Sequence, residues 1–214
     1  MNTNSRTFLT AAGIGLAAAM AAPQLFAEEP KPTEVEYYIP LRGDGSINPN
    51  PFLASGAGVG KNVSVYYTAG TGPGFFSECN DPDDPTQRFI DPDFFETGCE
   101  LPEGVSITEA QGLNALNRVQ QNLEAQGLTL EDVVFLRIYL AAPPGADIAD
   151  YGGWNDAYRK FFANVDLVTG DPLLQYEPIE FLNPTRPART NLEVASLPVS
   201  GWLVELEAIA AFPK

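Results

Sequence analysis

The absence of histidine limits the chemistry that this chain can perform. The 214 residues include no His, so imidazole cannot act as a general base, activate a serine or cysteine, or ligate zinc. Any catalysis must therefore use Arg, Glu, Asp, Tyr, hydroxyl groups, backbone groups and water. The formal net charge of −16 also argues against a nucleic acid partner, because an acidic surface repels phosphate groups.

The two cysteines, Cys79 and Cys99, lie in a stretch rich in Pro, Asp and Gly. In an oxidising compartment such a pair forms a disulfide more often than a reactive site, so we predict a bond that closes this loop. The same stretch carries a group of carboxylates: Asp81, Asp83, Asp84, Asp91, Asp93 and Glu96. They could ligate a hard cation, but their spacing does not match an EF-hand loop, which favours a solvated acidic surface without a metal.

The N-terminal segment has the pattern of an export signal. Residues 1–6 are polar and basic, residues 8–22 are apolar, and Leu25-Phe26-Ala27 provides a small-residue cleavage site. We predict a signal peptide over residues 1–27, a tether over 28–34, and a periplasmic or secreted protein without a membrane anchor after cleavage. Both bacterial export routes stay open, and an uncleaved membrane anchor is the alternative.

The remaining chain alternates between helical and strand periodicity. Helices are predicted over residues 106–126, where Ser106 and Glu109 form a capping box and Gly127 provides a left-handed stop, and over residues 151–164. The second helix has a predicted buried stripe of Trp154, Ala157, Tyr158, Phe161 and Phe162. Strands are predicted over 35–41, 63–68, 133–140, 190–197 and 202–212, with a short extended piece over 176–181. The first two strands are separated by predicted turns rich in glycine and proline: Gly43, Gly45, Pro49, Pro51, Gly56, Gly58 and Gly60. The last two strands alternate well enough to form a hairpin. This order indicates one α+β domain in which two helices lie on one face of a mixed sheet.

Several blocks in this order resemble the RidA family, the YjgF-like reactive intermediate deaminases that are often labelled endoribonuclease L-PSP. The blocks are Glu124-Ala125-Gln126-Gly127-Leu128, the strand 132–140, the helix 154–162, and the ending 186–198 followed by 204–210. The resemblance covers residues 106–213 well and 51–70 weakly. It implies a single domain over 35–214 with insertions at about 72–105 and 165–183.

The resemblance implies a chorismate-mutase-like subunit, a homotrimer with a central barrel, and active-site clefts between subunits. The implied reaction is hydrolysis of a 2-imino acid or enamine to a 2-keto acid and ammonia, without a cofactor. Arg189 matches the arginine that binds the substrate carboxylate, which a guanidinium can hold by two parallel hydrogen bonds. Glu205 matches the glutamate that orients the attacking water, and Asn155 matches an asparagine that lines the cleft.

Two positions depart from the family pattern. The segments that supply further substrate contacts are matched by Asn50-Pro51-Phe52 and Thr68-Ala69-Gly70, so Phe52 and Ala69 lack the hydroxyl groups of the family, while Gly70 is retained. Neighbouring residues could provide a substitute hydroxyl: Tyr67, Thr68 and Thr71.

Three functions remain open at this stage. The first is an exported imine or enamine hydrolase acting on small carboxylated substrates. The second is a non-catalytic trimer that binds a small carboxylate in the same cleft, which the missing hydroxyls favour. The third is a chaperone-like scaffold that uses the acidic surface and the insertions. A ribonuclease role conflicts with the charge and with the lack of His.

Overall fold

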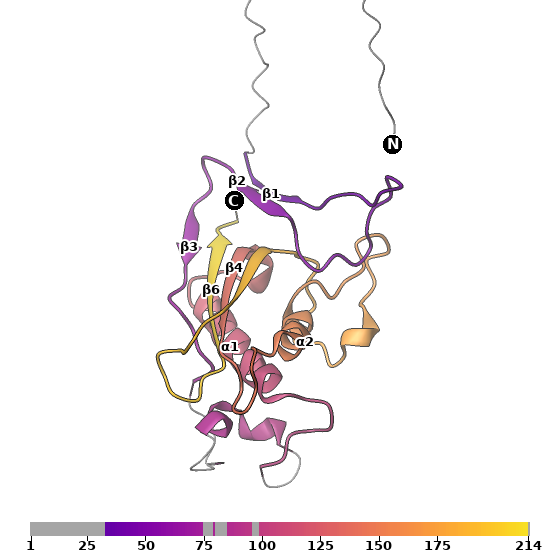
Figure 1. Ribbon diagram of the computed structural model, residues 1–214. Coiled ribbons are helices and arrows are strands. Elements are labelled where there is room, and N and C mark those ends of the chain that lie inside the picture. The colour runs from indigo at the N-terminus through magenta and orange to yellow at the C-terminus, as the bar shows by residue number, and fades with distance from the viewer. Residues whose placement is uncertain (1–32, 75–78, 80–84, 96–98, 214) are drawn as a thin grey trace, which may run out of the picture. The chain divides into compact units, whose positions relative to one another are not determined.

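The computed structural model describes residues 33–74, 79, 85–95 and 99–213 (Figure 1). The predicted signal peptide and most of the predicted tether lie outside these residues. None of the described helices is long and apolar enough to cross a membrane.

A four-stranded mixed sheet forms the centre of the domain. It consists of β3 (Val65–Tyr67), β6 (Val204–Ala211), β4 (Val133–Leu140) and β5 (Ala188–Glu193), in the order β3-β6-β4-β5. Strand β6 is antiparallel to both β3 and β4, whereas β5 is parallel to β4. A second, two-stranded antiparallel sheet pairs β1 (Val35–Tyr38) with β2 (Gly56–Val59).

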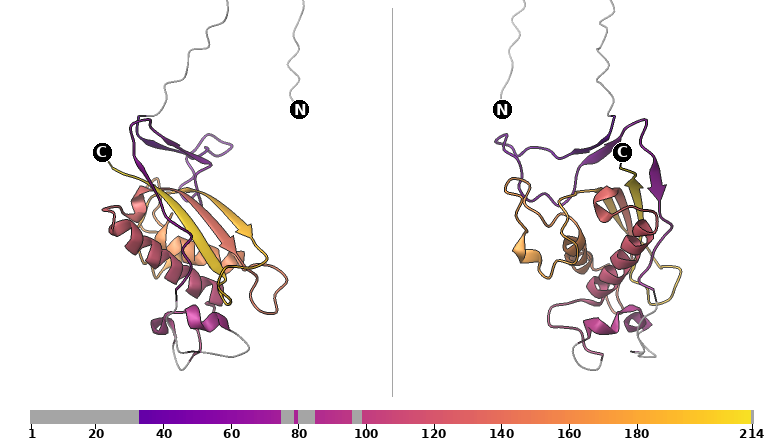
Figure 2. Two further views of the ribbon diagram at one scale, coloured as in Figure 1. Left: turned by 90° about the vertical axis from the view of Figure 1, so that its left-hand side faces the viewer. Right: turned by 180° about the vertical axis from the view of Figure 1, so that it is seen from behind.

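Two helices, α1 (Ile107–Glu124) and α2 (Tyr151–Phe161), cover one face of the four-stranded sheet, and within the described ranges no helix covers the other face (Figure 2). Short 3-10 segments lie at Pro85–Phe89, Pro92–Phe94, Leu130–Asp132 and Leu174–Tyr176. The predicted α+β class, with a mixed sheet and two helices on one face, is therefore confirmed.

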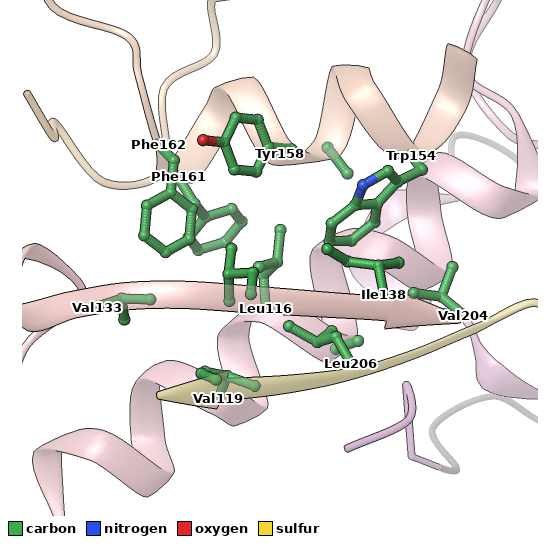
Figure 3. Close-up of a cluster of buried hydrophobic side chains, with 14 of the residues drawn as sticks. Leu116, Val119, Val133, Ile138, Trp154, Tyr158, Phe161, Phe162, Val204 and Leu206 are labelled. Atoms are coloured by element: carbon green, nitrogen blue, oxygen red, sulfur yellow. The ribbon is translucent and has the colours of Figure 1, made fainter. Parts of the chain in front are cut away.

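The core lies between the helices and the sheet (Figure 3). The helical stripe predicted for α2 is buried, including Trp154 and Phe161, and it packs on the strand positions Ile138 and Leu206. On β4 and β6 alternate residues are buried because successive side chains point to opposite faces of a sheet. One face of the sheet is thus committed to the core, and the other carries the more polar positions.

The start and end of α1 follow the capping pattern. The hydroxyl of Ser106 accepts a hydrogen bond from the Glu109 N–H at 3.1 Å. Gly127 has a φ of 74°, a left-handed conformation that glycine adopts without steric cost, and it ends the helix as predicted. The helix itself stops at Glu124, two residues before the predicted boundary.

Three strand predictions are wrong. The predicted hairpin over 190–197 and 202–212 does not form, because β6 pairs with β3 and β4 while β5 pairs with the far edge of β4. The predicted extended piece over 176–181 contains no strand. Strand β2 was predicted as a turn because of its glycines, yet its backbone pairs with β1 in full register.

The predicted disulfide between Cys79 and Cys99 is present. The segment around it is held against α1 by two fully or almost fully buried amides. Gln111 donates to the carbonyls of Thr86 and Gly201 at 2.9 and 2.8 Å, and Asn114 donates to the Phe89 carbonyl at 2.8 Å. Of the acidic residues in this loop, Asp81, Asp83, Asp84 and Glu96 lie outside the described residues.

Candidate functional site

Arg189, the second residue of β5, is held in a defined orientation with part of its hydrogen-bonding capacity unused. Its Nη2 donates to Oδ1 of Asn155 on α2 at 2.6 Å. Its Nη1 is buried and has no hydrogen-bond partner among the described residues. Burial lowers the pKa of Arg189 to about 10, so the group remains cationic at neutral pH. A buried N–H without a partner is costly, and an anionic ligand would satisfy it.

Two aromatic rings support this guanidinium. The Arg189 Cζ atom lies 4.3 Å from the centre of the Phe52 ring and 4.2 Å from that of Tyr158. The two rings are stacked, with centroids 5.4 Å apart, and the Tyr158 hydroxyl donates to the Phe52 carbonyl at 3.1 Å. The loop that carries Phe52 and helix α2 therefore hold the Arg189 guanidinium together, through cation–π contacts with two rings and a hydrogen bond to the Asn155 side chain. Three of the residues predicted for the site, Arg189, Asn155 and Phe52, form this first cluster, which we call the arginine half-site.

The remaining predicted residues form a second cluster, the glutamate half-site. A Cβ atom on Gly70 would collide with the Oε1 atom of Glu205, so a larger residue at this position would displace the carboxylate from its present place. The segment after Gly70 is fixed to β6, since Thr71 and Leu206 exchange backbone hydrogen bonds of 2.9 and 3.0 Å. Ala69 is exposed beside it.

Glu205 and Glu207 form a pair of carboxylates, of which Glu205 has no ion-pair partner in the part of the chain that the structure describes. Its neighbour on the same face of β6, Glu207, is paired with Arg137 at 2.7 Å. Partial burial, and secondarily the charge of Glu207, raise the pKa of Glu205 above its ordinary value. A carboxylate with a raised pKa is a better proton acceptor than an ordinary one, which suits general acid–base chemistry. The described residues include no group of three or more His, Cys, Asp or Glu positioned to hold a metal ion.

The two half-sites lie on opposite faces of the sheet. Arg189 is opposite Leu136 in the β4–β5 register, and Leu136 is buried on the helix face. Glu205 is opposite Tyr139 on β4, three residues further along that strand and therefore on the other face. One subunit thus does not bring Arg189 and Glu205 together.

Of the three candidate hydroxyl groups, two already form hydrogen bonds within the fold. The hydroxyl of Thr68 accepts the Ala208 N–H at 2.9 Å and is buried. Tyr67 is 64% exposed and is opposite Ile209, so it shares the face of Glu205. Thr71 donates to the carbonyl of Ala69 at 3.1 Å.

Sequence reasoning missed three residues of the arginine half-site's surroundings: Tyr158 and Arg159, which interact electrostatically with Arg189, and Arg186, which interacts with both of them. Tyr158 was assigned to the core, where its ring lies, but the same ring also contacts the guanidinium. A signal existed for Arg159, which follows Asn155 by one helical turn and so shares its face. For Arg186 the sequence offered no periodicity, because it lies in an irregular segment before β5.

The family described as Endoribonuclease L-PSP matches residues 103–212. Among solved structures, a YjgF/YER057c/UK114 family member from Mycobacterium tuberculosis is 25% identical, with 69% of this chain and 79% of that chain covered and a TM-score of 0.38. The Rid family protein YyfB from Yersinia pestis is 18% identical, with coverages of 74% and 86% and a TM-score of 0.41. E. coli TdcF with bound serine is 20% identical, with coverages of 70% and 82% and a TM-score of 0.39. No curated protein matches the chain.

Proposed function

Because the chain belongs to the endoribonuclease L-PSP family, which matches more than half of its length, we propose that it hydrolyses 2-imino acids or their enamine tautomers to 2-keto acids and ammonia. The observation that carries this proposal is the unpartnered, buried Nη1 of Arg189 beside an Nη2 that Asn155 already orients. Such an arrangement suits the carboxylate that every 2-imino acid carries. The endoribonuclease label itself fits poorly with a chain of net charge −16 that lacks His.

The proposed reaction divides its tasks between the two half-sites. Arg189 binds the substrate carboxylate and so places the adjacent C=N carbon. Glu205 accepts a proton from a water molecule as the water oxygen bonds to that carbon, and the imine nitrogen takes up a proton from solvent, which gives a neutral carbinolamine. Glu205 then gives its proton to the nitrogen of the carbinolamine. In the collapse of that intermediate the hydroxyl proton passes to the Glu205 carboxylate as the C=O bond forms, and the C–N bond breaks with its electron pair leaving on ammonia; Glu205 finally returns its proton to solvent.

The active site proposed here combines two copies of the chain. Arg189 and Glu205 lie on opposite faces of the sheet in one subunit, so a joint site requires the arginine half-site of one copy and the glutamate half-site of its neighbour. A homotrimer with three such clefts satisfies this requirement, and it would also cover exposed apolar positions on the helix-free face, such as Tyr67.

The compartment we propose is the periplasm or the extracellular space. The Cys79–Cys99 disulfide supports this location, because such bonds persist in oxidising compartments. The predicted signal peptide gives the same location.

A non-catalytic carboxylate-binding trimer is the second candidate. It is favoured by Phe52 and Ala69, which stand where the deaminases carry hydroxyl groups. Its arginine half-site would be the same, and only the role of Glu205 would differ.

A coupled assay distinguishes the two functions. An amino acid oxidase generates imines, and keto acid release is followed with and without the mature protein. We expect the wild type to accelerate keto acid release. Glu205→Gln should lower this rate about a hundredfold or more while carboxylate binding is retained. Arg189→Lys should lower the rate roughly tenfold, because lysine keeps the charge but not the two parallel hydrogen bonds of the guanidinium. Arg42→Lys, on an exposed arginine, is the matched control. No acceleration for any amino acid, together with carboxylate binding, would favour the binding protein.

A further inference from the structure

Three buried or half-buried arginines gather at the arginine half-site without a carboxylate to balance them. Arg159 and Arg186 are only 4% and 2% exposed, and Arg189 is half-buried. Among the described residues none of the three forms an ion pair, although the sequence has 28 Asp and Glu against 12 Lys and Arg. In so acidic a chain, this concentration of unbalanced positive charge points to an anion that is supplied from outside.

Arg159 shares an aromatic ring with Arg189, the residue proposed to bind the ligand. Its Cζ atom lies 4.1 Å from the centre of the Phe52 ring, the same ring that Arg189 contacts at 4.3 Å. Its Nη1 donates to Oδ1 of Asn50 at 2.8 Å and to the carbonyl of Ala163. A second ring, that of Tyr176, lies 4.7 Å from the same Cζ atom. These contacts satisfy neutral groups only and leave the charge of Arg159 uncompensated.

Arg186 adds a third positive charge nearby. It donates to the carbonyl groups of Val165 and Pro184, and weakly to that of Pro51 at 3.4 Å. Burial, and secondarily the charge of Arg159, lower the pKa of Arg186 to about 10, while Asp166 acts on it from beyond ion-pair distance. The positive charges therefore repel one another, and they are held together by the backbone and the aromatic rings.

A single carboxylate on Arg189 neutralises only one of these charges. A second acid group on the same ligand would be attracted by the positive charges of Arg159 and Arg186. This attraction is screened less at buried positions than in bulk water. We infer, on the basis of the proposed function, that the preferred ligand is a dicarboxylate, such as the imine or keto acid of an acidic amino acid. Arg159 is then a specificity-determining residue that acts through its charge and does not touch the reacting atoms.

The test compares two ligands that differ by one charge. 2-Oxoglutarate and its 5-methyl ester share the skeleton and the 2-keto acid group, and calorimetry gives the affinity of each. If the Arg159 guanidinium and the second carboxylate are about 8 Å apart, at an effective dielectric constant of about 40, their attraction raises the affinity about fivefold. We expect the wild type to prefer the diacid by at least this factor.

Variants at Arg159 separate charge from packing. In Arg159→Gln the preference for the diacid should fall about fivefold, whereas Arg159→Lys should keep most of it. Arg42→Gln removes an exposed charge and should leave the preference unchanged. If Gln and Lys at position 159 lower the preference equally, Arg159 acts by packing and the inference is wrong.

The wild-type comparison decides the matter even if a variant does not fold. Equal affinities for the diacid and the ester would overturn the inference and leave the proposed function standing. Absence of binding by both ligands would overturn the proposed carboxylate site as well.

Discussion

Mixing two inactive variants tests whether the active site combines two copies of the chain. Arg189→Ala removes the carboxylate contact, and Glu205→Gln removes the proton acceptor, so each variant alone should be inactive. The two residues lie on opposite faces of the sheet, as their registers with Leu136 and Tyr139 show. A site made by two neighbouring copies can therefore receive its arginine from one variant and its glutamate from the other.

The expected recovery follows from random assembly. In an equal mixture, half of the copies retain Arg189 and half retain Glu205, so about a quarter of the interfaces should hold both, whatever the number of subunits in the ring. The assay is keto acid release after the two chains are co-expressed with different tags, with mixed oligomers verified by mass spectrometry. A mixture of Arg189→Ala with Arg189→Lys is the control, and its activity should not exceed the mean of the two separate variants. Mixed oligomers without recovered activity would refute the two-copy site.

Three further predictions concern the glutamate half-site and the disulfide-linked segment. Glu207→Gln removes a neighbouring negative charge, so the pKa of Glu205 should fall. Because the rate is lost at low pH when Glu205 becomes protonated, this acid limb of the pH–rate profile should move to lower pH. An unchanged acid limb would exclude Glu205 as the titrating base. Gln111→Ala leaves buried backbone groups without partners and should cost about 3 kcal/mol in urea unfolding, whereas Gln120→Ala should cost less than about 0.5 kcal/mol. Ala69→Ser restores a hydroxyl at an exposed position and should raise the rate of an imine hydrolase in the coupled assay, but leave a pure binding protein inactive.

Local features of the fold could be predicted from the sequence because they depend on neighbours along the chain. The capping box at Ser106, the glycine stop at Gly127 and the buried stripe of α2 are short-range patterns of this kind. The disulfide could be predicted because the chain holds only one pair of cysteines. The class of the domain followed from the order of these elements.

Strand pairing was decided by tertiary structure. Periodicity shows which residues of a strand share a face, but it does not specify the partner strand. The two closing strands alternate as a hairpin would, yet β6 pairs with β3 and β4, and β5 joins the far edge of β4. Strand β2 was missed for a related reason, since its glycines carry no side-chain signal and only the pairing with β1 makes it a strand.

The composition of the site shows the same division. Sequence resemblance identified Arg189, Glu205, Asn155, Phe52 and Gly70 as candidates, because each lies in a short matching block. Only the tertiary structure separated them into two half-sites, since the face on which a side chain lies depends on the register of β4 with its neighbours. It also brought Arg159 to the ring of Phe52, across more than a hundred residues of chain, a contact that no local pattern encodes.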